Sequence, residues 1–303
     1  MTYKEWLAEW LEYYVKPAAK PRTYKKYLRQ AENHIVPALG GYEPDGLTAL
    51  VLQRFTVSLT ERGLAASTVG GILSVIGSSL KKAVALGLIA AEHTDKVVRP
   101  KTRQKKVEAF SLTEQRRIER YICARDGKLF GVLFCLYTGL RIGELLALEW
   151  TDLDLERGVL TVSKTCVDSW VNGRYVKITQ APKTETSART IPIPKQLLPR
   201  LTEQRKRRTC AYFVCGRSEY GSQVRSYQKT FDRLLKKLGI PHRGFHTLRH
   251  TFATRALESG MDIKTLSEIM GHKNPSITLA RYAHSLFEHK ADMMNRLGSL
   301  LVE

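Results

Sequence analysis

Apolar residues recur at the three- and four-residue spacing of helices along nearly the whole chain, and one stretch departs from this pattern. Between residues 158 and 194, apolar and polar residues alternate in three short segments, 159–162, 175–178 and 189–193. Alternation is typical of strands buried on one face, and the Asn-Gly pair at 172–173 is typical of a hairpin turn. We therefore expect a mainly α fold that includes a small antiparallel β-sheet.

Residues 1–95 predict a small bundle of helices. The expected helices cover residues 3–15, 23–35, 48–63 and 67–87. Thr48 and Ser67 are the expected N-caps, and the second helix should end before Pro37. One face of the first helix carries a stripe of large apolar residues, Trp6, Leu7, Trp10, Leu11 and Tyr14. We interpret this stripe as core, because that is its usual role at this spacing.

Residues 111–303 predict a second domain of mixed type. Ser111 and Glu114 form a Ser-x-x-Glu capping box, which predicts that a helix begins there. Further helices are expected at residues 195–208, 222–238, 247–259, 263–270, 276–282 and 285–300. With the alternating segments between them, these helices predict an α+β domain.

The strongly positive net charge of the chain indicates what kind of partner it binds. Lys and Arg number 49 against 29 Asp and Glu, which gives a formal net charge of +20 at pH 7. Such a field attracts a polyanion and repels a basic partner. Residues 99–106 hold five cations, a proline and no apolar residue. This composition predicts a linker at 96–110, whose charges either follow a phosphate backbone or are simply solvated.

Other classes of protein find no support in the sequence. No apolar run approaches the length of a membrane span, and the amino-terminal residues lack the apolar stretch of a signal peptide, so we expect a cytoplasmic protein. The five cysteines are far apart without a Cys-x-x-Cys pair, which suggests neither a disulfide framework nor a zinc site. Without a carboxylate cluster or a phosphate-binding Gly-x-x-x-x-Gly-Lys motif, we expect no metal, ATP or other cofactor.

Four short motifs follow one another in the second half of the chain. They are Thr138-Gly-Leu-Arg141-Ile-Gly-Glu144-Leu, Pro182-Lys183-Thr-Glu-Thr-Ser-Ala-Arg189-Thr-Ile-Pro, His246-Thr-Leu-Arg249-His250-Thr-Phe-Ala-Thr, and Met270-Gly-His272 followed by Thr278-Leu-Ala-Arg-Tyr282-Ala-His284. Each alone is weak, but their joint occurrence in a basic chain is specific. Together they closely resemble the catalytic domain of the tyrosine recombinase (phage integrase) family over residues 111–300. The motif sequences are most similar to those of integrases of conjugative transposons.

The resemblance implies a domain order. It predicts a helical, SAM-like core-binding domain for DNA in residues 1–95, the basic linker at 96–110, a catalytic domain at 111–284 and a carboxyl-terminal helix or tail at 285–303. Such integrases commonly carry an arm-binding domain before the core-binding one, whereas here the bundle begins at the first residues. Either the protein works without arm sites or the chain is truncated.

The resemblance also implies partners. The expected partner is double-stranded DNA, held by a homotetramer on two DNA sites. An accessory DNA-bending protein can be a further partner. The tail has an apolar face at helical spacing, formed by Leu286, Phe287, Ala291, Met294, Leu297 and Leu300. Relatives give this face to the neighbouring protomer, and packing against its own domain is the alternative. In the linker, the expected DNA contacts are Lys101, Arg103, Lys105 and Lys106.

Cutting a DNA phosphodiester by direct attack requires fixed positive charge, because the transition state carries about one more negative charge than the substrate. Guanidinium is planar, permanently charged and able to bind two oxygens, so Arg141 and Arg249 are the expected pair. Glu144 resembles the family's supporting acid, and an ordinary surface ion pair is the alternative. His250 is expected to pack within its helix, and His284 receives no role.

The expected nucleophile is the phenol of Tyr282. A free phenol has a pKa of about 10, so only roughly one part in a thousand is ionised near neutral pH and it needs help to lose its proton. The resemblance assigns that help to His246, a hydrogen bond to the phosphate to His272, and protonation of the departing sugar oxygen to Lys183.

The sequence thus predicts a bacterial or phage-encoded recombinase that acts on the nucleoid. It would cut and rejoin duplex DNA through a 3′-phosphotyrosyl intermediate, in a metal-independent transesterification that conserves bond energy. A type IB topoisomerase and a non-catalytic DNA-binding regulator are the alternatives. The target DNA sequence, and the choice among integration, excision, inversion and resolution, are not encoded in these motifs.

Overall fold

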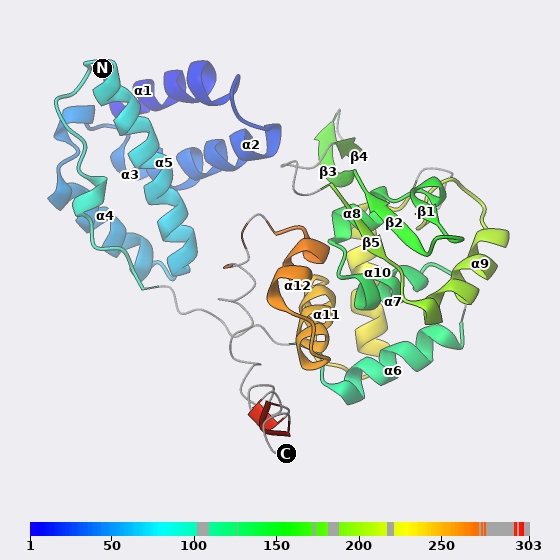
Figure 1. Ribbon diagram of the computed structural model, residues 1–303. Helices are drawn as coiled ribbons and strands as arrows, with labels where there is room; N and C mark the ends of the chain where they lie inside the picture. Colours follow the sequence, from blue (N-terminus) through cyan, green and yellow to red (C-terminus); the bar gives the residue numbers. More distant parts are fainter. Residues whose placement is uncertain are drawn as a thin grey trace. The chain divides into compact units, whose positions relative to one another are not determined.

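The computed structural model divides into two compact units, Met1–Lys105 and Lys106–Glu303 (Figure 1). The residues that it describes are 1–101, 109–125, 127–171, 174–180, 188–216, 221–272, 274, 276, 294–295 and 297–299. Helices dominate both units, and the described strands lie in the second one. The predicted class, mainly α with antiparallel sheet, is confirmed.

The first unit is a helical bundle. Its helical elements are α1 (Tyr3–Trp10), the π-helical turn η1 (Leu11–Val15), α2 (Pro21–Gln30), the π-helical turn η2 (Ala31–Ile35), α3 (Val36–Leu39), the 3-10 turn η3 (Pro44–Gly46), α4 (Ala49–Glu61), α5 (Ala66–Ala85) and the 3-10 turn η4 (Thr94–Lys96). The apolar stripe of the first helix packs in the core as predicted, except that Tyr14 is 39% exposed. Trp6 donates its indole N–H to the Ser79 carbonyl at 3.2 Å, which ties α1 to α5.

Two helix boundaries in this unit differ from the prediction. The helix does not end before Pro37, because the turn η2 passes directly into α3, where Pro37 lies in the first turn and its missing N–H is not needed. The N-cap of α5 is Ala65 rather than Ser67. The N-cap at Thr48 is confirmed, since its hydroxyl accepts from the Val51 N–H.

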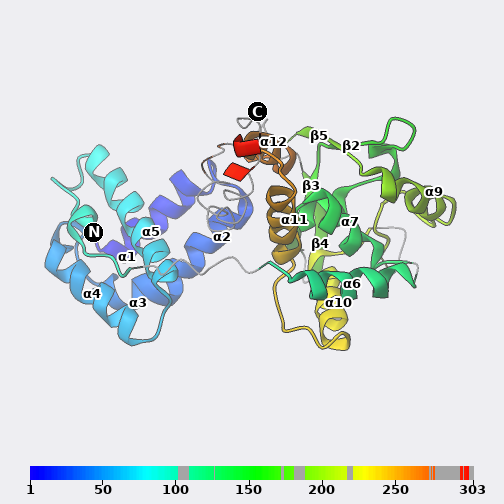
Figure 2. The same ribbon diagram turned by 60° about the horizontal axis from the view of Figure 1, so that its bottom comes forward.

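The second unit is built around one apolar helix, the second of its elements. Its elements are α6 (Leu112–Cys123), α7 (Phe130–Thr138), α8 (Ile142–Ala147), the 3-10 turn η5 (Trp150–Asp152), β1 (Leu153–Asp154), β2 (Val159–Val162), β3 (Thr165–Val171), β4 (Arg174–Gln180), β5 (Arg189–Pro192), the 3-10 turn η7 (Lys195–Leu197), α9 (Leu198–Lys206), α10 (Val224–Lys237), α11 (His246–Glu258) and α12 (Ile263–Met270). The capping box at the start of α6 is confirmed: Ser111 and Glu114 each bond to the other's backbone N–H. Figure 2 shows α11 beside α7 and α12 beside β5.

The strands form two antiparallel sheets rather than one. The order in the first is β1-β2-β5, and the second is the hairpin β3-β4. β3 was not predicted, because a charged residue, Asp168, interrupts its apolar pattern. The Asp168 carboxylate accepts from the N–H groups of Val224 and Arg225 at 3.0 and 2.9 Å. A residue of β3 therefore caps α10, whose own N-cap residue supplies no side-chain bond.

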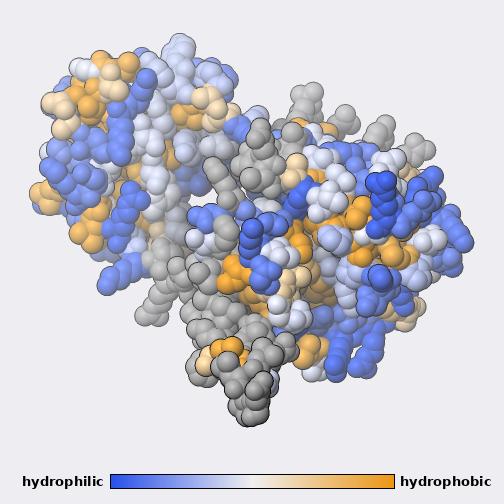
Figure 3. All heavy atoms as spheres, viewed as in Figure 1, coloured by the Kyte–Doolittle hydropathy of each residue, from blue (hydrophilic) through white to orange (hydrophobic). Residues whose placement is uncertain are grey.

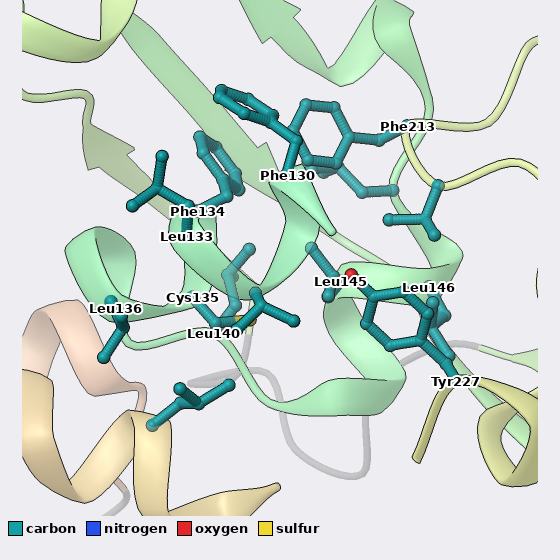
Figure 4. Close-up of a cluster of buried hydrophobic side chains, with 14 of the residues drawn as sticks. Phe130, Leu133, Phe134, Cys135, Leu136, Leu140, Leu145, Leu146, Phe213 and Tyr227 are labelled. Atoms are coloured by element: carbon teal, nitrogen blue, oxygen red, sulfur yellow. The ribbon is translucent and has the colours of Figure 1, made fainter. Parts of the chain in front are cut away.

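The core of the second unit is built on α7. Every residue of this helix except Tyr137 is buried, as expected for a helix that is apolar on all sides. Figure 4 shows its side chains among those of neighbouring segments. The ring centroids of Phe134 and Phe213 lie 4.7 Å apart. This rigid core supports the turn at the end of α7, where the first motif begins.

One disulfide joins Cys210 and Cys215, a pair that the cysteine spacing did not suggest. The two lie five residues apart in an irregular segment that folds back on itself, a geometry that Cys-x-x-Cys spacing rules do not detect. Within the described residues, no cluster of His, Cys, Asp or Glu could hold a metal ion. Nor is any described helix both long and apolar enough to cross a membrane.

Asp168→Ala should lower the free energy of unfolding by about 1–2 kcal/mol, because two N–H groups at the start of α10 lose their acceptor. Chemical denaturation of the whole chain measures this difference. Asp154→Ala is the matched control: Asp154 also accepts two backbone N–H bonds, but in an exposed turn, and its loss should cost less than about 0.5 kcal/mol. Equal losses for the two variants would contradict the capping role of Asp168.

Candidate active site

Two glycine turns position the motif residues of the second unit. Gly139 ends α7 and Gly271 ends α12, both in the left-handed region with φ of +65° and +62°. A Cβ on Gly139 would lie 2.4 Å from the Phe252 ring, and one on Gly271 would lie 2.9 Å from the Arg189 guanidinium. Glycine at these positions therefore allows both the backbone conformation and the close packing. The first turn leads to Arg141 and the second to His272.

Arg249 connects the two turns from inside the protein. It lies on α11 and is only 1% exposed. Its Nη1 donates to the Gly139 carbonyl at 2.8 Å and its Nη2 to the Met270 carbonyl at 2.6 Å. The same Nη2 lies 2.9 Å from Nε2 of His272. A buried cation is costly unless it is paired and hydrogen-bonded, so these contacts are what stabilises Arg249 in place.

Arg141 and Glu144 form one unit at the start of α8. Arg141 is the N-cap, and its backbone N–H and its Nη1 donate to the two Glu144 carboxylate oxygens at 2.9 and 2.7 Å. Nη2 of Arg141 donates to the Gly271 carbonyl at 3.1 Å. The Arg141 side chain remains 36% exposed, whereas Glu144 is 6% exposed. The guanidinium of Arg141 is thus fixed at its base and open to solvent.

Arg189 is a third arginine of the same cluster. It lies on β5 and donates from Nη1 and Nη2 to the two Glu144 oxygens at 3.2 and 3.0 Å, and from Nε to the Ile269 carbonyl at 2.6 Å. Arg189 belongs to one of the four motifs, but no role was predicted for it. The sequence did contain a signal for it: Arg189 lies two residues before the buried Ile191 and so on the same face of β5, and an arginine on such a face needs a buried acceptor.

The three arginines bind three successive carbonyl groups at the end of α12, those of residues 269, 270 and 271. The last carbonyls of a helix lack intrahelical donors and carry the negative end of its dipole. Backbone dipoles therefore hold most of this cluster, with one carboxylate against three guanidiniums. The net charge of the cluster stays positive, which suits an anionic ligand.

The Glu144 carboxyl is ionised within this cluster. Burial by itself would raise its pKa, but the hydrogen bonds and charge of Arg189 and the charge of Arg141 lower it below the usual range of glutamate. The interpretation of Glu144 as an exposed surface ion pair is not what the structure has, because the carboxylate is buried.

His246 begins α11, one turn before Arg249, and its side chain is exposed. Its ring contacts that of His250 edge to face, with 4.5 Å between centroids. His250 is half-buried, in keeping with the packing role expected of it. His246 and Arg249 are therefore carried by the same rigid helix.

The structure thus brings together Arg141, Glu144, Arg249 and His272. Lys101 is exposed, at the end of the first unit. Six of the residues discussed above, together with nearly all of the tail, lie outside the described residues: Arg103, Lys105, Lys106, Lys183, Tyr282 and His284. The described part of the site is a cage of permanent cations beside an imidazole, which can bind a phosphate and stabilise negative charge that develops on it.

Comparison with known proteins identifies related sequences for both units. Residues 113–289 match the phage integrase family, and residues 2–59 match the phage integrase N-terminal SAM-like domain. A tyrosine recombinase XerC-like protein of Caldanaerobacter subterraneus subsp. tengcongensis is 32% identical, over all of this chain and 84% of the relative. The ICEBs1 integrase of Bacillus subtilis is 26% identical, over 93% of this chain and 79% of that protein.

Solved structures share the fold. A fragment of the Tn1549 transposon integrase in complex with a circular intermediate DNA superposes with a TM-score of 0.82 at 24% identity, covering 98% of this chain and 99% of that one. A lambda integrase dimer bound to a COC′ core site gives 0.70 at 18% identity, covering 93% and 77%. At these identities, the likeness establishes the arrangement of helices and strands.

Glu144→Gln should make stability less sensitive to acid. A carboxyl whose pKa is lowered on folding stabilises the protein above its unfolded pKa of about 4.3, and this contribution is lost as the pH falls through the folded value. We expect the wild-type chain to lose more stability than the variant below about pH 4.3. Denaturant unfolding at several pH values measures how steeply the free energy of unfolding of each protein falls with pH.

The control for this comparison is Glu203→Gln. Glu203 pairs with Arg207 at 2.8 Å on the surface of α9, where both side chains are about half exposed. Its removal should change stability by less than about 0.5 kcal/mol at any pH. If Glu144→Gln and Glu203→Gln show the same acid dependence, the Glu144 carboxyl does not have the lowered pKa that its surroundings indicate.

Proposed function

The chain belongs to the phage integrase family and is a tyrosine-type site-specific recombinase, and we propose that Tyr282 is its nucleophile and that the arginine cluster described above binds the scissile phosphate. The observation that carries this proposal is the convergence of Arg141 and Arg249 on the turn that presents His272. These three side chains come from three separate motifs, and one helix end holds them.

Arg141 and Arg249 stabilise the phosphate as charge develops on it. Arg141 is the more accessible of the two and offers its N–H donors to a nonbridging oxygen, while Arg249 supplies a fixed charge from behind. His272 donates a hydrogen bond to the phosphate. Because guanidinium does not titrate in the physiological range, this stabilisation is present at every working pH.

The covalent step exchanges one ester for another. The Tyr282 phenol oxygen forms a bond to phosphorus, its proton passes to His246, and the bond to the 5′ sugar oxygen breaks while Lys183 protonates that oxygen. The product is a 3′-phosphotyrosyl bond and a free 5′-hydroxyl. Attack by a 5′-hydroxyl of the partner strand reverses the step, so the reaction needs no external source of energy.

Both units contribute to DNA binding. The first unit exposes four cations along α2, namely Arg22, Lys25, Lys26 and Arg29. Later in the sequence, Lys101 lies in the basic run of the linker, which Arg103, Lys105 and Lys106 continue. On the face seen in Figure 3, hydrophilic side chains cover much of each unit. We assign DNA binding by residues 1–95 and the linker at 96–110 to this charge, and catalysis to residues 111–284, with affinity that falls steeply as salt rises.

Two DNA sites would be joined in a homotetramer, with the tail at 285–303 exchanged between protomers. One support is the apolar face in the tail sequence. The other is the structure of a lambda integrase tetramer bound to a Holliday junction, whose chain matches this one with a TM-score of 0.68. The Tn916 transposase of Enterococcus faecalis, 26% identical over 86% of this chain and 69% of that protein, supports a role in a mobile genetic element.

Deleting residues 285–303 should abolish cooperative assembly on DNA while single-site binding remains. Electrophoretic mobility shifts, with increasing protein on one-site and two-site DNA, measure both properties. Unchanged cooperativity after the deletion would contradict exchange of the tail between protomers.

Tyr282→Phe should abolish covalent attachment to DNA and retain binding. The assay incubates the protein with a library of nicked duplexes, whose nick traps the intermediate, and resolves the products on a denaturing gel. Tyr121→Phe, a tyrosine on α6 whose ring lies against Arg125, is the matched control and should form the adduct at the wild-type level. An adduct that persists in Tyr282→Phe would remove Tyr282 as the nucleophile.

The adduct assay and a plasmid relaxation assay together separate this function from the two alternatives. Binding without any adduct in the wild-type chain would indicate a regulator. Relaxation of supercoiled plasmid by the isolated chain, without exchange between two sites, would indicate a topoisomerase.

A further inference from the structure

The carboxylate of Glu144 is shared between two arginines. Its Oε1 accepts from Nη1 of Arg141 at 2.7 Å and from Nη1 of Arg189 at 3.2 Å. Its Oε2 accepts from the Arg141 backbone N–H at 2.9 Å and from Nη2 of Arg189 at 3.0 Å. Two bonds on each oxygen fill the acceptor capacity of a carboxylate. The Arg141 guanidinium has a single bond to this carboxylate, whereas Arg189 binds it with two.

This geometry divides the charge unequally. Two parallel N–H bonds from one guanidinium form the strongest pairing with a carboxylate, and both Arg189 and Glu144 are more than nine-tenths buried. Arg189 therefore supplies two of the three side-chain bonds that offset the Glu144 charge. Arg141, which is the exposed partner, keeps its positive charge available to a ligand. Without Arg189, both Glu144 oxygens could bind Arg141 alone and cancel its charge.

We propose that Arg189 is a positioning residue of the recombinase: by pairing with Glu144, it keeps Arg141 oriented and net positive toward the scissile phosphate. This inference rests on the proposed function, in which Arg141 binds that phosphate. Arg189 does not touch the phosphate in this arrangement and acts through Glu144.

A second contact connects Arg189 to the rest of the site. Its Nε donates to the Ile269 carbonyl, one residue before the carbonyl that holds Arg249. Its guanidinium also packs on Gly271, where an added Cβ would lie 2.9 Å from Nη1. Arg189 thus fixes both Glu144 and the end of α12 from β5, six residues after Lys183 in the sequence.

The strand that carries Arg189 has other sources of stability. β5 pairs with β2 through its backbone, from Val159 opposite Pro192 to Val162 opposite Arg189. The side chain of Ile191, on the same strand, is buried in the core. Replacement of Arg189 should therefore leave β5 in place and change mainly the charges near Arg141.

The test compares four variants, Arg189→Gln, Arg189→Lys, Glu144→Gln and the double variant Arg189→Gln/Glu144→Gln. For each, the single-turnover rate of adduct formation on the nicked DNA and the Kd for that DNA are measured. We expect Arg189→Gln to lower the rate by about 10- to 100-fold with Kd changed less than about threefold, because it acts through a neighbour of the reacting atoms. Arg189→Lys keeps the charge but loses the paired N–H bonds, so its rate should lie between those of the wild-type chain and Arg189→Gln.

The double variant distinguishes positioning from mere structural support. It removes the Glu144 carboxylate, which without Arg189 would cancel the charge of Arg141, so we expect it to react faster than Arg189→Gln. If Arg189 only supported the fold, removal of a second buried partner would make the double variant as slow or slower, and that result would overturn the proposal. An unchanged rate in Arg189→Gln would overturn it as well.

Two controls make the outcome specific. Arg157→Gln removes an arginine of the same unit whose side chain is 84% exposed, and it should leave rate and Kd unchanged. Thermal unfolding of each variant checks that the chain is folded under the conditions of the assay. If the wild-type chain forms no adduct, the proposed function fails; if it does and Arg189→Gln matches it, this inference alone fails.

Discussion

The carbonyl groups at the end of α12 are the acceptors on which the candidate active site depends. Three arginines from a strand, a helix and a helix N-cap each donate to one of these carbonyls. A buried guanidinium without acceptors costs several kcal/mol, so Arg249 occupies its position because carbonyl groups at the ends of α7 and α12 accept its N–H groups. Because neutral dipoles rather than carboxylates supply most of the acceptors, the cluster remains a site for an anion.

The glycines of two motifs make this arrangement possible. Gly139 and Gly271 each end a helix in the left-handed region, and each leaves space that a neighbouring side chain fills. The turn at Gly139 places Arg141 at the start of α8, and the turn at Gly271 exposes its carbonyl to Arg141. Motif residues far apart in the sequence therefore meet because two local backbone conformations direct them to one point.

The sequence predicted local features better than long-range ones. The caps at Thr48 and Ser111 follow from residues three positions apart, and the apolar stripe on the first helix follows from its spacing. By contrast, β3 escaped prediction because Asp168 serves a helix 56 residues away, and Arg189 had no assigned role because its acceptor, Glu144, is 45 residues away. Such partners become visible only when the fold places them together.

The most direct test of the account is a structure of the protein on nicked DNA with vanadate bound at the break. Vanadium should lie between the Tyr282 phenol oxygen and the 5′ sugar oxygen, with Arg141 facing the equatorial oxygens, Arg249 behind it and Arg189 still paired to Glu144. Vanadate bound through another nucleophile, or with the Arg141 guanidinium turned away from it, would contradict this arrangement.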